Sequence, residues 1–509
     1  MPFQLLRIAC LLTIFMPFCA WGDVPVVHST QGERMVAEGL LIITNVGKKQ
    51  NYDFHDSRTL DAAVLSPKSV VFHPDGSRYY VNSLEGCATV VYDAKSQERI
   101  KVIRHAFKSG AGALWSKPSG YYRFTHYPDG PSRAFSGKPV ESEFSHGGRY
   151  LWVPFYRRTF DLNAQDPSAV AIIDTRTDSI VHMMETGPLP KMIKANHTGT
   201  LMAVTHWGNN TVGLIDISSD SPAQWHHLPP VVIEKEFVPD FSLTIPVNRD
   251  AHSGLLLRGT VFTPDDRYLL VGCMGGGGIA VVDMASAQPR YLGKVGGIYN
   301  ARHLIVSGNY LYASVNAAGI VQRIPFDSLT VAIERRSGSY FDAHGWQSCK
   351  VGGGARTIEA SPGGRFIFAA CNTASALYVV DTRHMRTVGR IAVDSYPVGL
   401  DIARDGHFLV VTSQGRDGLG GNAVNLFRID YLDGNEEKAA RAAIEAIPDT
   451  AAAVVTDAEM PCPTLPERFF HPSTTWIILM GAGVAAVVAG AAATIIRRKK
   501  KRKVSPKKP

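Results

Sequence analysis

The chain has 509 residues, of which 45% are hydrophobic and 19% charged, and its formal net charge at pH 7 is +8. This composition excludes a disordered or low-complexity protein and leaves ample apolar material for a core. Nine Lys or Arg residues and no acid lie in 497–509, so the rest of the chain is close to neutral. The positive charge is therefore no evidence for nucleic-acid binding, and we expect none.

Residues 1–22 have the features of a secretory signal peptide. Arg7 precedes an apolar run over 8–19, and Ala20 and Gly22 stand where a signal peptidase requires small residues. The run is too short for an ordinary membrane span. We therefore expect the rest of the chain to begin outside the cytoplasm, with the signal removed.

A strand–turn–strand pattern then recurs along the chain. In its clearest copy, Ser69 to Ser83 (SVVFHPDGSRYYVNS), two runs of alternating or β-prone residues flank Pro74-Asp75-Gly76, a sequence that favours a tight turn. The further copies are Glu141–Val153, Met192–Thr205, Gly259–Gly272, His303–Ser314, Thr357–Asn372 and Gly399–Thr412.

A third strand that ends in Asp often follows each pair. These strands end at Asp93, Asp174, Asp216, Asp283, Asp381 and Asp430. A fourth, weaker strand often comes next. Four short strands per unit, repeated at a spacing of about 40 residues or more, are typical of the blades of a β-propeller.

The motifs HPDGSRYYVNS, TPDDRYLLVG, SPGGRFIFAACN and RDGHFLVVT resemble the YVTN β-propeller repeat of bacterial secreted and surface-layer proteins. The resemblance covers roughly 39–430. It implies a propeller fold and an extracytoplasmic setting, and it implies little about function because the family is mostly uncharacterised.

We predict an all-β propeller over residues 39–432. Seven first-strand motifs predict seven blades. Leu40–Ser57 is a partial unit that in one interpretation completes the last blade and closes the ring, which would remove open sheet edges. An eighth blade is the alternative. Tyr127–Gly130 repeats the turn sequence, but no strand pair surrounds it, so it is not counted.

The C-terminal part predicts a membrane anchor. Residues 433–475 read as a stalk, first Ala- and Glu-rich and helical and then rich in proline. Trp476–Ile496 is an uncharged apolar segment long enough to span a bilayer, and the basic tail 497–509 should remain in the cytoplasm. Together with a cleaved signal, this predicts a single-pass type I protein of the plasma (inner) membrane. A sorting signal is a weaker interpretation, because no LPxTG motif is present.

Cysteine usage points to no metal or cofactor. Five cysteines follow the signal: Cys87, Cys273, Cys349, Cys371 and Cys462. The number is odd, so at least one is unpaired or pairs between chains, and Cys349–Cys371 is the candidate bridge. No CxxC, HxxxH or HExxH pattern occurs, so we predict neither a bound metal nor another cofactor.

One position of the repeat is predominantly basic. Six residues before Pro74 and its equivalents, five of the seven copies carry Lys68, Lys191, Arg258, Arg302 and Arg356, and two carry Val140 and Val398. The first strand of a blade lines the central channel, so these residues should converge at one mouth. Clustered cations favour an anion, which could be a carboxylate, phosphate, sulfate or acidic side chain of a partner. The alternative is that each cation pairs with a local acid.

Long insertions at 104–138, 223–257 and 326–353 are expected to lie on the same face, between a fourth strand and the next first strand. Loops on a rigid scaffold commonly carry binding residues. We assign to this face also His206, Trp207, His303 and Arg416. The alternative is that the insertions pack over the blades without a binding role.

These features predict an interaction module for an unidentified partner protein or anionic ligand. The alternative is a propeller enzyme that resembles lactonases or dehydrogenases, with or without a metal, and uses the same face. Lactonase-type sites need Glu, Asp and Asn in the channel, and the basic row counts against them. No Gly-x-Ser-x-Gly nucleophile motif is present.

Overall fold

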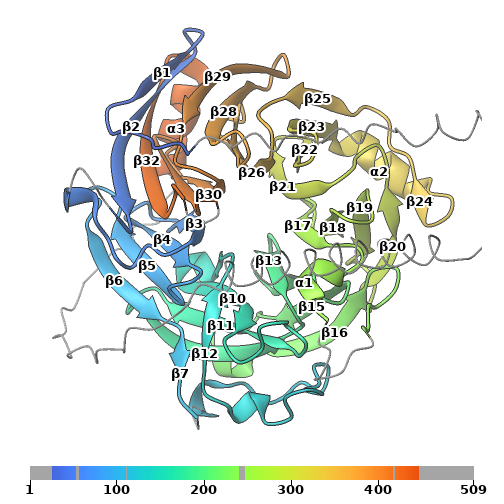
Figure 1. Cartoon of the computed structure of the whole chain (residues 1–509). Coiled ribbons are helices and arrows are strands. Elements are labelled where there is room, and N and C mark those ends of the chain that lie inside the picture. Colours follow the sequence, from blue (N-terminus) through green and yellow to red (C-terminus); the bar gives the residue numbers. More distant parts are fainter. Residues whose placement is uncertain (1–25, 53–56, 110–111, 240–246, 417–418, 446–509) are drawn as a thin grey trace, which may run out of the picture. The chain divides into compact units, whose positions relative to one another are not determined.

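The computed structural model describes residues 26–52, 57–109, 112–239, 247–416 and 419–445. These residues form seven antiparallel sheets of four strands or more, arranged in a ring around a central channel (Figure 1). The fold is therefore an all-β, seven-bladed β-propeller, and the eight-bladed alternative is wrong. The chain divides into two compact units, Met1–Ala451 and Ala452–Pro509, and the second lies outside the described residues.

Each blade is built outward from the channel. The first consists of β3 (Pro67–Phe72), β4 (Arg78–Ser83), β5 (Ala88–Asp93) and β6 (Arg99–Arg104). The second is β9 (Glu143–Ser145), β10 (Tyr150–Arg158), β11 (Ser168–Asp174) and β12 (Ser179–Thr186), with β8 (Phe135–Pro139) and β7 (Ala106–Phe107) added along β10. The third is β13 (Pro190–Ala195), β14 (Leu201–His206), β15 (Thr211–Asp216) and β16 (His226–Val232).

The other four blades follow the same order. The fourth is β17 (Leu257–Phe262), β18 (Tyr268–Cys273), β19 (Ile279–Asp283) and β20 (Arg290–Val295), with β24 (Tyr340–Phe341) parallel to β20. The fifth is β21 (Ala301–Ser307), β22 (Tyr310–Val315), β23 (Ile320–Pro325) and β25 (Gln347–Lys350). The sixth is β26 (Ala355–Ala360), β27 (Phe366–Cys371), β28 (Ala376–Asp381) and β29 (Arg386–Ala392). The seventh is β30 (Pro397–Ile402), β31 (Phe408–Ser413), β32 (Ala423–Tyr431), β2 (Leu41–Gln50) and β1 (Arg34–Ala37).

The N-terminal strand β2 closes the ring. It pairs antiparallel with β32 along its whole length, from Leu41 opposite Tyr431 to Gln50 opposite Ala423. This confirms that the partial unit at Leu40–Ser57 completes the last blade. Because backbone groups of β32 would otherwise be unpaired, the closing strand removes an open edge.

The core consists of seven separate apolar clusters, one between each pair of neighbouring blades. Each sheet is therefore covered on both faces. This explains why the second and third strands read as near-continuous apolar runs, as in Leu269–Val271, where all three side chains are fully buried.

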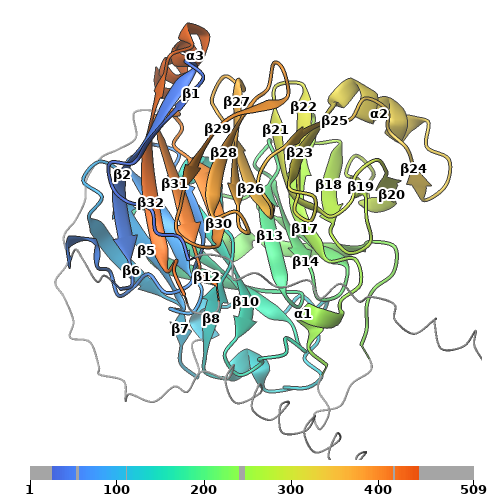
Figure 2. The same cartoon turned by 45° about the horizontal axis from the view of Figure 1, so that its top comes forward.

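The propeller has two distinct faces. Turns between first and second strands, such as the one at Gly76 with its positive φ of 74°, lie on one of them, which we call the turn face. Connections into each first strand lie on the opposite one, the mouth face. The helix α3 (Gly434–Glu445) follows β32 at the turn face, and α1 (Arg249–His252) lies on the mouth face (Figure 2).

The helix α3 packs on the propeller. Ala440 is fully buried in the cluster between the sixth and seventh blades, and the Glu436 carboxylate accepts a hydrogen bond from the Gly363 N–H at 2.8 Å. The first residues of the predicted stalk therefore form part of the folded unit.

Two of the long insertions contain the fourth strand of a blade. The 223–257 insertion includes β16, the fourth strand of its blade, followed by α1. The 326–353 insertion contains β25, so its helix α2 (Phe326–Glu334) precedes the fourth strand and lies at the turn face. The expectation that 326–353 covers the mouth face as a whole is therefore wrong, because its fourth strand was not recognised.

The predicted Cys349–Cys371 bridge does not form. Both cysteines are free, as are Cys87 and Cys273. Cys349 lies on the outermost strand of the fifth blade and Cys371 on the second strand of the sixth, and each sulfur contacts an oxygen instead. The remaining cysteine, Cys462, is outside the described residues.

Among the described residues, no helix combines the length and the apolar character that a membrane crossing requires. The predicted signal (1–22), the stalk beyond α3, the predicted span (Trp476–Ile496) and the basic tail (497–509) all lie outside those residues.

Candidate functional site

The innermost strand of six blades starts with a β-bulge. In the first blade Pro67 pairs with Ser83 and Ser69 with Asn82, which leaves Lys68 out of the ladder. The residues in this position, in chain order, are Lys68, Lys191, Arg258 with Gly259, Arg302, Arg356 and Val398. A bulge re-aims a side chain relative to the regular pleat. The basic position of the repeat is thus the position of the bulge.

A left-handed residue precedes each bulge by two positions. These residues are Ser66, Leu189, Leu256, Asn300, Gly354 and Tyr396, all with φ between 51° and 76°. For a bulky side chain this conformation costs about 1–2 kcal/mol, so the surrounding contacts must hold it. The carbonyl of Leu189, for example, accepts a hydrogen bond from the Trp207 N–H at 3.0 Å.

Hydrogen bonds between blades fix the bulges. The Ser314 hydroxyl, on the second strand of the fifth blade, donates to the backbone carbonyl of Arg356 in the sixth at 2.6 Å. Thr205 of the third blade makes the same kind of bond to the Arg258 carbonyl at 3.3 Å. The position of each basic residue therefore depends on its neighbouring blade as well as on its own strand.

The five basic side chains converge, as expected for the inner row of a propeller. Burial and the positive charges of Arg356, Arg258, Lys191 and Arg302 hold the pKa of the Lys68 amine well below its ordinary value. Burial also lowers the pKa of Lys191 to about 7. We call Lys68, Lys191, Arg258, Arg302 and Arg356 the basic ring.

Two members of the basic ring have acidic partners. Arg258 pairs with Glu141 at 2.9 Å, and Lys191 pairs with Asp250 of α1 at 3.1 Å. Lys191 also lies 4.0 Å from the centre of the Tyr156 ring and 4.7 Å from that of Trp207, so it is held by cation–π contacts. For these two cations the alternative of pairing with a local acid holds.

The other three members have no carboxylate partner among the described residues. Arg356 is 4% exposed, and its Nε donates to the carbonyl of Val398 at 3.2 Å. The Nε of Arg302 is buried and makes no hydrogen bond within the described part of the chain, while one of its terminal nitrogens contacts the sulfur of Met274 at 3.5 Å. Lys68 forms no ion pair with any described residue. Lys68, Arg302 and Arg356 are therefore the ring members without a carboxylate partner among the described residues, and Lys191, with a pKa of about 7, is only partly protonated at neutral pH.

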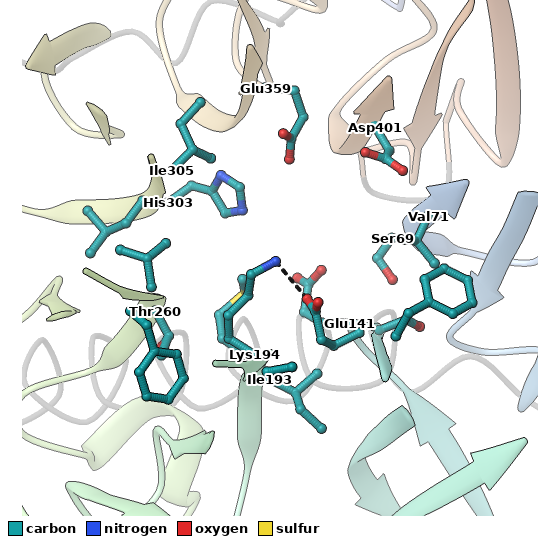
Figure 3. Close-up of a pocket in the computed structure, with 18 of the residues that line it drawn as sticks. Ser69, Val71, Glu141, Ile193, Lys194, Thr260, His303, Ile305, Glu359 and Asp401 are labelled. Carbon is teal, nitrogen blue, oxygen red and sulfur yellow. Dashed lines mark hydrogen bonds and ion pairs between the residues drawn. The ribbon is translucent and has the colours of Figure 1, made fainter. Parts of the chain in front are cut away.

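The structure places the remaining predicted site residues differently. His206 is fully buried inside its blade, where its ring nitrogens contact the hydroxyls of Thr186 and Thr211, so it does not reach the face. Trp207 is half-buried beneath Lys191. Arg416 is half-buried in the loop after β31. His303 lies on β21 and faces the channel rather than a loop (Figure 3).

A cavity of about 600 Å³ occupies the channel between the ring and the turn face. It begins at the residues directly after the ring positions, among them Ser69, His303 and Thr357, and extends to the turns at His146 and His197. Its walls come from the innermost strands of all seven blades.

The channel carries a second row of side chains three residues beyond the ring positions. In chain order these are Val71, Glu143, Lys194, Val261, Ile305, Glu359 and Asp401. Figure 3 shows Lys194, Glu359 and Asp401 directed into the central space. Three carboxylates and one amine thus face one another within the cavity. The first row is mostly basic, whereas the second row, for which no prediction was made, contains three carboxyl groups.

The charges of this second row are only partly balanced. Lys194 pairs with Glu143 at 2.8 Å. Burial and the nearby Asp401 raise the pKa of Glu359 well above its ordinary value, and burial raises the pKa of Asp401 to about 7. Asp401 also accepts a hydrogen bond from the Phe72 N–H at 2.6 Å, and Glu359 has no cationic partner among the described residues.

The second row was not predicted from the sequence, although its members stand at a fixed distance from the basic position in the aligned repeats. The bulge shifts the pleat by one residue, so a strict alternation from the basic position does not predict that the third residue along also faces the channel. The described residues contain no group of three or more His, Cys, Asp or Glu side chains that could hold a metal ion.

No family model matches the chain, and no curated protein matches it. Solved structures to which it is similar include Kuenenia stuttgartiensis hydrazine synthase, at 13% identity and a TM-score of 0.48, over 74% of this chain and 99% of that one. A second is the β-propeller domain of Myceliophteria thermophila Cps50 (Swd1), at 13% identity and a TM-score of 0.45, over 75% of this chain and 99% of that one. A third is a functionally unknown protein from Desulfotomaculum acetoxidans DSM 771, at 12% identity and a TM-score of 0.46, over 73% of this chain and 98% of that one. These distant likenesses indicate nothing about function. The propeller assignment follows from the strand pairing of the chain itself.

Replacement of Lys68 by Met should stabilise the ligand-free protein. The change keeps most of the aliphatic volume and removes one buried cation from a cluster of like charges. We expect the free energy of unfolding at neutral pH to rise by roughly 1–2 kcal/mol, measured by denaturant titration. The exposed Lys95→Met variant is the control and should change it by less than about 0.5 kcal/mol. A loss of stability in Lys68→Met would contradict a repulsive ring.

Asp401 should make stability fall as pH rises from about 4 to about 7. In this window the folded protein keeps a proton on Asp401 that the unfolded chain has released, because the folded pKa is about 7. Asp401→Asn keeps an acceptor for the Phe72 N–H and removes this titration. At about pH 8 we expect the variant to be roughly 2 kcal/mol more stable than the wild type, with the difference vanishing toward about pH 4. Asp220→Asn, at an exposed position, should leave the pH profile unchanged; an identical profile for Asp401→Asn would refute the prediction.

Proposed function

We propose that this protein is a membrane-anchored, extracytoplasmic binding module whose basic ring holds an anionic group of a ligand or partner. The observation that carries the proposal is the set of three ring cations, Lys68, Arg302 and Arg356, that lack a carboxylate partner among the described residues. A propeller fold is compatible with an interaction module, since it presents a rigid ring of loops and a channel.

The energetics of the ring favour an incoming anion. Removing a cation from water costs several kcal/mol unless a counter-charge and hydrogen bonds replace the solvent. Here bulges, left-handed residues and inter-blade hydrogen bonds hold the cations in place without such a counter-charge for three of them. An anion that accepts hydrogen bonds from Arg302 and Arg356 would supply both, and would also raise the pKa of Lys68 toward its ordinary value.

The membrane location is supported by the sequence. The signal-like segment 1–22, the apolar Trp476–Ile496 and the basic tail 497–509 together favour a type I arrangement. The described chain ends with α3, which follows β32 at the turn face. The basic ring lies at the mouth face, opposite the turn face on which α3 lies.

The repeat motifs favour kinship with the YVTN-type propellers. That assignment depends on the turn and second-strand sequences, such as HPDGSRYYVNS, and on the polar residue near the end of the second strand. In the first blade this residue is Asn82, which donates to the Glu141 carbonyl of the next blade at 3.1 Å.

Anion binding can be tested with phosphate and citrate on the full-length chain. We expect either anion to raise the unfolding temperature above that in sodium chloride of equal ionic strength. Arg356→Gln should weaken binding about tenfold to a hundredfold, because a charge-assisted hydrogen bond contributes about 1.5–3 kcal/mol. Arg176→Gln makes the same change of charge on an exposed turn, and should have little effect. Equal affinities of wild type and Arg356→Gln would exclude the ring as the anion site.

The membrane arrangement has its own test. In intact cells or spheroplasts, protease added from outside should digest an epitope placed in the loop at 338, and an epitope appended after 509 should be protected. The protein should stay in the membrane fraction after alkaline carbonate extraction, and deletion of 476–509 should release it. Retention of the deleted form would argue against the C-terminal anchor.

A further inference from the structure

The cavity and the two rows of charge point to a more specific ligand. The basic ring occupies five of the seven innermost strands, and the second row follows three residues further along. Three residues of β-strand span about 10 Å. Along the channel, the backbone positions of the basic ring are therefore followed after about 10 Å by those of Glu359 and Asp401, the two second-row acids without an ion pair to a described cation.

We infer that the channel binds a small zwitterionic ligand, with an acidic group at the basic ring and an amine at Glu359 and Asp401 about 10 Å away. This inference rests on the proposed anion site and adds the second half of the ligand. A short peptide with free ends is the simplest molecule of this class, since three extended residues span about 10 Å.

The surroundings of the second row suit an amine. Lys194 forms its ion pair with Glu143, and neither Glu359 nor Asp401 forms an ion pair with a described cation. Although burial opposes it, Glu143, Glu359 and Asp401 together raise the pKa of Lys194. The cavity therefore already stabilises one ammonium group and holds two further carboxylates.

The cavity, which begins directly after the ring positions and is lined by the second row, also has room for a small molecule. A cavity of about 600 Å³ lies within the range that small-ligand sites occupy. Val261 and Ile305 form apolar parts of its wall, and His303 stands between the two rows. Burial lowers the pKa of His303 to about 3, so this side chain is neutral and adds no repulsion toward an amine. Glu141 forms an ion pair with Arg258 alone among the ring cations, although its charge also acts on Lys68, Arg302 and Arg356.

Calorimetric titration of the full-length chain with triglycine tests the inference. The comparison ligands are N-acetyl-triglycine, which lacks the amine, and triglycine amide, which lacks the carboxylate. We expect each blocked peptide to bind at least tenfold more weakly than triglycine. Diglycine and pentaglycine should also bind more weakly, because their ends do not match the separation of the rows.

Two variants test which row of the channel binds the amine of the peptide and which binds its carboxylate. In the Glu359→Gln/Asp401→Asn double variant, N-acetylation should no longer weaken binding, while the preference for a free carboxylate should persist. Arg356→Gln should show the reverse pattern. The double variant keeps acceptor and donor groups of similar size, and its thermal unfolding will report whether it folds. Glu334→Gln, at an exposed ion pair on α2, is the matched control and should behave as wild type.

The outcomes separate the two proposals. If triglycine and N-acetyl-triglycine bind equally and Arg356→Gln weakens both, the amine site is wrong and the anion site stands. If no peptide binds, and phosphate and citrate bind without dependence on Arg356, both are wrong. Equal binding of diglycine, triglycine and pentaglycine would overturn the 10 Å separation.

Discussion

The bulge at the start of six of the seven innermost strands is the constraint on which the site depends. It takes one residue out of the ladder, and in five of the six bulged blades that residue is Lys or Arg. A left-handed residue two positions earlier sets the direction of the chain into the bulge, and a hydrogen bond from the neighbouring blade can hold it there. Each of these five blades thus directs a charged side chain toward the channel, and closure of the ring by β2 brings the five charges together.

The channel combines groups that ordinary packing would keep apart. Cations that lower one another's pKa lie at one level, and carboxylates with raised pKa lie one level beyond. Buried ionisable groups without partners reduce stability, and they are retained most readily where a ligand uses them. The inter-blade clusters, which are apolar throughout, supply the stability that allows this arrangement in the centre.

The repeats in the sequence predicted most of the architecture and the first of the two rows of charged residues in the site. Strand order, seven blades, the closing segment and the turns around Gly76 follow from local patterns of period two and from turn residues. The basic position also emerged from the alignment, because it recurs at a fixed distance from the turn. The second row did not, since Glu143, Glu359 and Asp401 share their position with apolar residues in other blades. The burial of His206 and the strand β25 inside an insertion likewise depend on contacts that no local pattern contains.

By itself, the sequence determined an all-β propeller with five basic residues at one repeat position, and it favoured seven blades over eight, because strand and turn preferences act over a few residues. Only the tertiary structure decided which of those cations are neutralised. Arg258 pairs with Glu141 from another blade and Lys191 with Asp250 from an insertion. Arg302 instead contacts the sulfur of Met274, and Arg356 donates a hydrogen bond to the backbone carbonyl of Val398. Pairing of charges depends on distances across the ring, and such distances are set only when all seven blades have closed.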